Sequence, residues 1–366
     1  MLQKFIYTLI LMKVLLANLC DSPENLHLEQ ALVSAAARRR GMTLDILHDF
    51  DFAYSFIPQK AGVRGFRLKY TGDAAARRAL AGGYDALLAL DFPKNRRCAP
   101  LFAWLFAGLK ASRRYFLANH LAPLKGHNFT ADIFRRAKLL RGARLAWSLE
   151  YDDPGPWKEF GLEPARFFRR PYCIDTGYYS PGRGDGCGGY VLSAGSAGRD
   201  FPALAKAAAR LGARLRVRSD SPRPAGFGSN GEAWLPFSPN LHTLLDDIRG
   251  SRLVALPVGG DFLNEAAGNS IAFMAMSCGR PVLARDTAYM RRYIKDGVNG
   301  FLYDGRSRKA LSAGLERALA QRPAALAALC RRARATMLER ASMAALSASV
   351  LEAVGLDAPD SPSAGF

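Results

Sequence analysis

Short apolar runs alternate with longer amphipathic segments along most of the chain. In the first half, the apolar runs at 12–18, 43–48 and 84–90 predict buried strands, and the amphipathic segment 24–40 predicts a helix. Alternation of this kind is typical of βαβ units that form a parallel sheet. The N-terminal half is therefore predicted to be an α/β domain.

The stretch 171–189 interrupts this alternation. It contains six glycines and two prolines, and it follows neither the helical nor the strand period. We interpret it as a linker between a first domain at 1–170 and a second domain at 190–340.

Apolar and amphipathic segments alternate again after the linker. Strands are predicted at 190–195, 213–217, 234–237, 253–258, 281–285 and 300–304, and helices at 200–211, 241–249 and 269–277. Residues 306–354 are predicted to be helical throughout, so that a C-terminal helix and a polar tail from 357 occupy 341–366. The predicted fold class is α/β, with two doubly wound Rossmann-like domains facing a central cleft and ligands beyond the carboxyl ends of the strands.

Length and cysteine usage agree with this organisation. A chain of 366 residues suits two domains, because a single hydrophobic core stops growing at about 250–300 residues. The six cysteines are scattered, without a CxxC pair or histidines at metal-ligand spacing. The sequence therefore predicts no metal site and no disulfide framework, and a reducing, cytoplasmic compartment fits best.

Residues 1–20 have the outline of a signal peptide, a short charged segment followed by an apolar run. Lys13 interrupts that run, and no small-x-small cleavage site follows it. A strand that begins at Met12 is the better interpretation, with residues 1–11 as an upstream extension and a weak interfacial anchor as the alternative. Whether the protein starts at Met1 or Met12 stays open.

Positive charge is concentrated in one part of the chain. The formal net charge is +19, and residues 94–144 carry twelve lysines and arginines against a single acid, Asp132. An arginine-rich composition would explain this, but so would attraction to anionic lipids, at about 1 kcal/mol per basic residue near the surface. No nucleic-acid-binding motif is present, so nucleic acid is not an expected partner.

Apolar side chains interleave with these charges, and some are expected to lie in a membrane interface, namely Trp104, Phe106, Leu109 and Phe116. The sequence thus predicts an anionic membrane surface as a partner of residues 94–144. The expected location is the cytoplasm, peripherally on the inner face of the membrane.

The segment 253–303 carries the clearest candidate chemistry. A strand ends in Pro257, a glycine-bearing loop follows, and Gly268, Asn269 and Ser270 open a helix. A helix start presents free N–H groups and the positive end of the helix dipole, which suits a diphosphate, and Asn269 or Ser270 can cap the helix or donate to the ligand. An ordinary capped helix that packs its apolar side chains into the core is the alternative.

Four ordered segments resemble the family 4 retaining glycosyltransferases, or glycosyl transferases group 1. They are the motif Ala275-Met-Ser-Cys-Gly-Arg-Pro-Val-Leu283, the motif Asp296-Gly-Val-Asn-Gly-Phe-Leu302, the interdomain segment Tyr172–Pro181, and the strand and glycine loop Val191–Asp200. The resemblance covers roughly residues 160–320.

One departure from the family pattern affects its acidic groups. The family has two glutamates in an E-x7-E pattern, and this chain has Ala266 and Met274 at those positions, with Glu265 one residue out of register. The small-Gly-Gln-Thr sequence of one branch of the family is similar to the segment 267–270.

The resemblance implies a GT-B fold and transfer of a sugar, with retention of configuration, from a UDP- or GDP-sugar. The implied acceptor is a lipid-linked or polysaccharide molecule of the bacterial cell envelope. The nucleotide sugar is a co-substrate, so no cofactor is expected, and no metal is expected because the donor loop lacks a DxD pair.

Candidate residues follow from the resemblance for the donor side. The donor diphosphate is expected at Gly198, Arg199, Gly268, Asn269 and Ser270, with Arg199 stabilising the charge that grows on the leaving group.

Acceptor-side candidates are Asp91, which follows the strand 84–90, and His27, which follows the first strand; ordinary structural roles are the alternative for both.

Two further functions stay open: a non-catalytic binding or assembly protein on the same scaffold, and a sugar-nucleotide epimerase. A Rossmann dehydrogenase is not favoured, because no GxGxxG motif follows a first strand.

Overall fold

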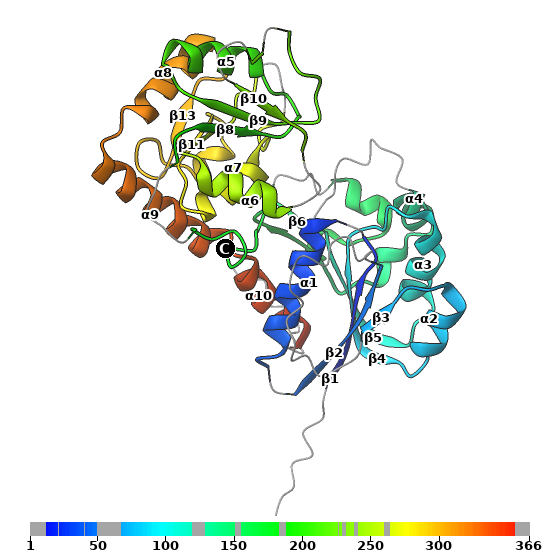
Figure 1. Cartoon of the computed structure of the whole chain (residues 1–366). Helices are drawn as coiled ribbons and strands as arrows, with labels where there is room; N and C mark the ends of the chain where they lie inside the picture. The colour runs from blue at the N-terminus through cyan, green and yellow to red at the C-terminus, as the bar shows by residue number, and fades with distance from the viewer. Residues whose placement is uncertain are drawn as a thin grey trace, which may run out of the picture. The chain divides into compact units, whose positions relative to one another are not determined.

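The computed structural model describes residues 12–20, 22–39, 41–49, 67–118, 129–150, 155–182, 188–225, 227–228, 232–237, 241–259 and 264–355 (Figure 1). The predicted extension at 1–11, part of the predicted linker at 183–187 and the tail from 357 lie outside these residues. The chain divides into two compact units, one of Met1–Tyr172 with Met343–Phe366 and one of Cys173–Ser342.

The first unit contains a parallel sheet. In the described part of the chain its strand order is β3-β2-β1-β4-β5-β6-β7. The strands are β1 (Met12–Asn18), β2 (Met42–His48), β3 (Arg67–Lys69), β4 (Tyr84–Leu90), β5 (Ala111–Leu117), β6 (Leu145–Leu149) and β7 (Phe167–Arg170). The strands predicted at 12–18, 43–48 and 84–90 are confirmed to within one residue.

Helices cover both faces of this sheet. They are α1 (Pro23–Ala36), α2 (Asp73–Ala79), α3 (Ala99–Ala107), α4 (Phe129–Arg136) and α10 (Met343–Gly355), with short 3-10 turns at Arg96–Cys98, Leu139–Gly142, Gly155–Phe160 and Pro164–Arg166. Helices α1 and α10 pack together on one face, and α2, α3 and α4 lie on the other (Figure 1). Helix α1 begins at Pro23, where the Ser22 side chain accepts a hydrogen bond from the N–H of Asn25, and it ends four residues before the predicted end.

The apolar residues expected in a membrane interface are in the core instead. Phe106, Leu109 and Phe116 are buried, and Trp104 packs against the same cluster. The reason is that β5 lies inside the sheet between β4 and β6, and α3 covers it. Burial of this apolar surface stabilises the fold by roughly 25 cal/mol per Å². The expectation that Phe106, Leu109 and Phe116 meet lipid was therefore wrong, and Trp104 is partly buried against the same core.

The second unit contains another parallel sheet. Its order in the described residues is β10-β9-β8-β11-β12-β13. The strands are β8 (Val191–Ala194), β9 (Leu215–Arg218), β10 (Ala233–Leu235), β11 (Leu253–Ala255), β12 (Val282–Arg285) and β13 (Phe301–Tyr303). All six correspond to predicted strands, but β11 ends at Ala255 rather than at 258, because the residues after it turn to pair with another loop.

Helices α5 (Phe201–Arg210) and α8 (Arg308–Leu319) cover one face of the second sheet, and α6 (Leu241–Gly250), α7 (Asn269–Ser277) and α9 (Pro323–Arg340) cover the other (Figure 1). A 3-10 turn spans Met290–Arg292. The segment predicted to be helical throughout 306–354 is three helices, because α8 ends at Leu319 and Pro323 begins a new helix.

The predicted α/β class with two doubly wound sheets is confirmed. Each sheet has one point where the strand order reverses, between β1 and β4 and between β8 and β11. Among the described residues, no helix combines the length and the apolar character needed to cross a bilayer.

Candidate functional site

The second sheet reverses its strand order between β8 and β11, so the loops that follow these two strands diverge from a common point. In open parallel sheets a ligand binds in the crevice at such a point, beyond the carboxyl ends of the strands. The two segments here are 195–200, which contains Arg199, and the one between β11 and α7, of which 256–259 and 264–268 are described. The topology therefore places both predicted donor-side segments at the same edge of the sheet.

Backbone hydrogen bonds join these two loops. Arg199 and Val258 form an antiparallel bridge. The N–H of Gly259 donates to the carbonyl oxygen of Gly198 at 2.9 Å, and the N–H of Asp200 donates to that of Pro257 at 2.6 Å. The position of Arg199 thus depends on the loop that follows β11.

The Arg199 guanidinium lies between two glycines. A Cβ atom added to Gly195 or to Gly268 would stand 3.1 Å from its Nη2, and both glycines have positive φ. The guanidinium also donates to the carbonyl oxygens of Ala197 at 2.9 Å and Ala194 at 3.4 Å. The side chain is therefore held against the start of α7.

Burial lowers the pKa of Arg199 to about 10, so the side chain stays charged at neutral pH. Within the described part of the chain, no carboxylate pairs with it. A partly desolvated cation without a carboxylate partner is a site where an anionic ligand gains binding energy.

The start of α7 presents N–H groups to the same place. Gly268 is the N-cap residue, at φ +89° and without a side-chain cap, so the expectation that Asn269 or Ser270 caps the helix was wrong. The N–H of Asn269 donates to the carbonyl oxygen of Ala266 at 2.9 Å, and the side-chain amide of Asn269 donates to the Tyr289 hydroxyl at 3.4 Å. Among the described residues, the N–H groups of Ser270 and Ile271 have no backbone acceptor.

The structure therefore brings four of the five predicted donor residues to one place: Gly198 and Arg199 lie in the first of the joined loops, and Gly268 and Ser270 lie at the start of α7. Asn269 is buried, and its side chain is directed to Tyr289 instead.

The two positions at which the family has glutamates hold Ala266 and Met274. Both side chains are buried, so apolar packing replaces acidic chemistry there.

In the first unit, Asp91 follows β4 at the corresponding point of strand reversal. Asp91 is buried and has a positive φ of 45°, and its N–H donates to the carbonyl oxygen of Leu117 at 3.1 Å. Burial, with a contribution from Asp91, raises the pKa of the neighbouring Cys20 thiol to about 12. His27, on α1, is also buried. Both acceptor-side roles stay predictions.

A buried polar cluster that the sequence analysis did not single out lies at the ends of β1 and β2. The Asn18 side-chain amide donates to Glu29 at 2.9 Å and to the carbonyl oxygen of Asn25 at 3.1 Å. Nδ1 of His48 lies 3.9 Å from the Glu29 carboxylate. Asn18 and His48 are the last residues of two apolar strands, and a polar residue at such a position is the signal that could have identified them.

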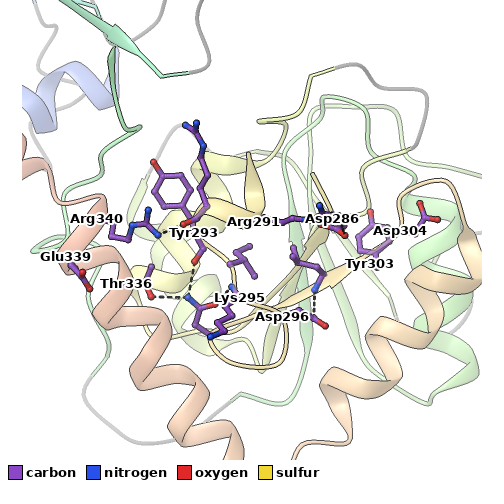
Figure 2. A pocket seen from close by; sticks show the side chains of 14 residues that line it. Asp286, Arg291, Tyr293, Lys295, Asp296, Tyr303, Asp304, Thr336, Glu339 and Arg340 are labelled. Carbon is purple, nitrogen blue, oxygen red and sulfur yellow. Dashed lines mark hydrogen bonds and ion pairs between the residues drawn. The ribbon is translucent and has the colours of Figure 1, made fainter. Parts of the chain in front are cut away.

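A separate pocket of about 750 Å³ lies in the second unit between the end of β13 and α9. Figure 2 shows Tyr303 and Asp304 at one end of it and Glu339 and Arg340 at the other. Acidic and basic side chains line it in equal numbers, and Arg291 and Asp286 form a bidentate ion pair at 2.6 and 2.7 Å. The pocket does not include Arg199 or the start of α7.

The family described as glycosyl transferases group 1 matches residues 234–337, which include α7 and both strands after it. No curated protein sequence matches the chain.

Three solved structures are similar to the chain. The Anabaena protein HepE, determined in complex with UDP and glucose, has a TM-score of 0.64 at 14% sequence identity, covering 94% of this chain and 99% of HepE. Sucrose-phosphate synthase from Thermosynechococcus elongatus has a TM-score of 0.62 at 13% identity, covering 94% and 98% of the two chains. A glycosyltransferase from Rickettsia africae has a TM-score of 0.61 at 11% identity, covering 94% and 97%.

At these identities the structural likeness establishes the fold, which spans nearly the whole chain, and the family match supports the resemblance seen in the sequence motifs. The protein therefore has the GT-B fold, and its second unit contains a region that matches the glycosyl transferases group 1.

Proposed function

We propose that the protein is a glycosyltransferase that moves a sugar from a nucleotide-sugar donor to an acceptor with retention of configuration. The observation that carries this proposal is the Arg199 guanidinium, held against the start of α7 at the point of strand reversal without a carboxylate partner among the described residues. The match of 234–337 to glycosyl transferases group 1 supports the same activity. HepE, which shares the fold, has been determined with UDP-glucose.

The chemistry would rest on charge stabilisation. As the bond between the sugar and the diphosphate breaks, negative charge grows on the departing phosphate oxygens. Arg199 and the N–H groups of Ser270 and Ile271 would meet that charge, and a preorganised donor of this kind lowers the barrier by about 2–4 kcal/mol. Because the donor loop has no DxD pair, we propose that these groups act without a divalent metal.

The proposed acceptor is a lipid-linked or polysaccharide molecule of the bacterial cell envelope, reached from the cytoplasmic face of the membrane. Exposed basic side chains of the first unit support attraction to an anionic surface, among them Lys94, Arg96, Arg136, Lys138 and Arg141. Asp91 and His27 are the proposed acceptor-side residues.

Nucleotide binding and sugar transfer test the proposal. The full chain is titrated with UDP, GDP and ADP by calorimetry, with and without EDTA, and then incubated with UDP- and GDP-sugars and a lipid-linked acceptor. We expect saturable binding of UDP or GDP that EDTA does not weaken, and a product whose anomeric configuration, read by NMR, equals that of the donor. Absence of binding by every nucleotide would contradict the proposal.

A non-catalytic binding protein is the second candidate, since Ala266 and Met274 replace the glutamates of the family pattern with buried apolar side chains. Tight UDP or GDP binding without transfer or hydrolysis would favour it. An epimerase would instead interconvert the free nucleotide sugar without an acceptor.

A further inference from the structure

Tyr303 lies at the end of β13, two strands away from β11, yet its hydroxyl reaches the loop that follows β11. The hydroxyl lies 3.0 Å from the carbonyl oxygen of Leu256 and 3.1 Å from that of Val258. Burial raises the pKa of Tyr303, so the side chain is a neutral hydrogen-bond donor at physiological pH. Its single hydrogen therefore serves both carbonyl groups.

These carbonyl groups belong to a tight turn. The N–H of Val258 donates to Leu256 at 2.9 Å, which closes a three-residue turn with Pro257 at its centre. Leu256 and Val258 are almost completely buried, so without Tyr303 the Val258 carbonyl would lose its hydrogen-bond partner away from water. The tyrosine thus holds this turn in place.

The Leu256–Val258 turn also holds Arg199 in place. Val258 is the residue that forms the bridge with Arg199. On either side of Arg199, Asp200 donates to the carbonyl oxygen of Pro257, and Gly198 accepts from the N–H of Gly259. On the far side of the turn, Nη1 of Arg285 donates to the carbonyl oxygen of Gly259 at 3.1 Å. The strand ends of β12 and β13 therefore act on the arginine through one backbone segment.

We propose that Tyr303 is a positioning residue for Arg199, which it holds against the start of α7 through the Leu256–Val258 turn. The inference rests on the proposed function for its catalytic meaning, but the structural coupling can be measured without a donor. Nothing in the motifs of the sequence singles out Tyr303, because it is a strand residue that acts across 45 residues of sequence.

Tyr303→Phe removes the hydroxyl and keeps the ring. Tyr190→Phe is the matched control: Tyr190 is in the same unit, and its hydroxyl also donates to a backbone carbonyl, that of Asp247 at 2.8 Å. Tyr190 precedes β8 and Arg199 follows it, so the two residues lie at opposite ends of that strand.

The first measurement is backbone hydrogen exchange in the full-length protein without nucleotide. We expect Tyr303→Phe to accelerate exchange about tenfold in peptides that contain the Asp200 and Gly259 N–H groups, and Tyr190→Phe to leave these peptides unchanged. Unchanged exchange in Tyr303→Phe would overturn the proposal. If that variant does not fold, Arg285→Gln, which releases the Gly259 carbonyl from the same segment, is measured in the same way with the same criterion.

The second measurement is a double-mutant cycle on UDP affinity. We expect Tyr303→Phe to weaken binding about threefold to tenfold in the wild-type background and not at all in Arg199→Ala. An equal loss in both backgrounds would show that Tyr303 acts independently of Arg199 and would overturn the proposal. Accelerated exchange in a protein that binds no nucleotide would instead support the positioning and contradict the proposed function.

Discussion

At the scale of single residues, Arg199 combines a desolvated charge with a fixed position. Two carbonyl oxygens accept hydrogen bonds from it, but neither neutralises its charge. Folding has therefore removed a guanidinium partly from water without a carboxylate partner in the described residues, which costs free energy unless an anion binds. Such an arrangement is typical of a binding site rather than of a stabilising ion pair.

Substitution of this side chain should act on binding more than on folding. We expect Arg199→Ala to weaken UDP affinity at least about tenfold, because a charge-assisted hydrogen bond contributes roughly 1.5–3 kcal/mol. The control is Arg210→Ala in the same unit, whose exposed side chain contacts Ser312 and Glu316. Calorimetric titration checks both variants, and equal UDP affinity in wild type and Arg199→Ala would contradict the assignment.

Gly268 offers an independent test of the same contact. At φ +89° any other L-residue is strained, and a Cβ would stand 3.1 Å from Nη2 of Arg199. Gly212 also has a positive φ, of 63°, but a Cβ there meets no atom within 4 Å.

Gly268→Ala and Gly212→Ala should each lose about 1–2 kcal/mol of unfolding free energy from backbone strain. We expect UDP affinity to fall only in Gly268→Ala, because only there does the new methyl group displace the guanidinium. Chemical denaturation and nucleotide titration measure the two effects separately. Equal UDP affinity in the two variants would show that the contact with Arg199 has no role in binding.

At the scale of elements, the described basic residues of 94–144 differ in their contacts. Some are engaged within the fold: Arg97 pairs with Asp49 at 2.8 Å, Arg135 pairs with Asp132 at 2.8 Å, and Arg114 donates to the Leu109 carbonyl at 3.0 Å. Others are exposed on and after α4, namely Arg136, Lys138 and Arg141. The group on and after α4 can therefore approach a flat anionic surface.

Replacing Arg136, Lys138 and Arg141 together by glutamine should weaken binding to vesicles that contain anionic lipid, by an order of magnitude or more at low salt. The matched control replaces three exposed basic residues of the second unit, Arg306, Lys309 and Arg331. Vesicle co-sedimentation at two salt concentrations measures the effect. Equal binding by both triple variants would show that membrane attraction is not specific to this group.

At the scale of the whole molecule, the last helix of the described residues, α10, belongs to the first compact unit. Helix α10 packs against α1, and its side chains Leu346, Val350, Leu351 and Val354 are buried. The first unit is therefore closed by a segment separated from it in the sequence by the entire second unit.

Leu351→Ala should lower the unfolding free energy by about 2–5 kcal/mol, because it opens a cavity in a core that no solvent reaches. Leu338→Ala on α9 is the control, since that side chain is 48% exposed and should change stability by less than about 0.5 kcal/mol. Denaturant unfolding compares the two. Similar losses in both variants would contradict the role assigned to α10.

The sequence by itself predicted the strands and most helices of the second domain, three strands and the first helix of the first domain, the change of pattern near 171–189 and the loops proposed to carry the donor site. These follow from local properties: the period of apolar residues, the position of glycines and the polar residue at a strand end. It did not separate α8 from α9, because two helices joined by a short turn continue one period of apolar residues.

The tertiary structure decided what depends on contacts between distant residues. It placed Phe106, Leu109 and Phe116 in the core, because β5 pairs on both sides and α3 covers it, whereas the local pattern of apolar and basic residues fits a membrane interface equally well. It brought Tyr303 to the turn that holds Arg199, and it packed α10 on α1. Burial and hydrogen-bond partners are properties of the folded arrangement, and residues 45 or more apart in the sequence meet only there.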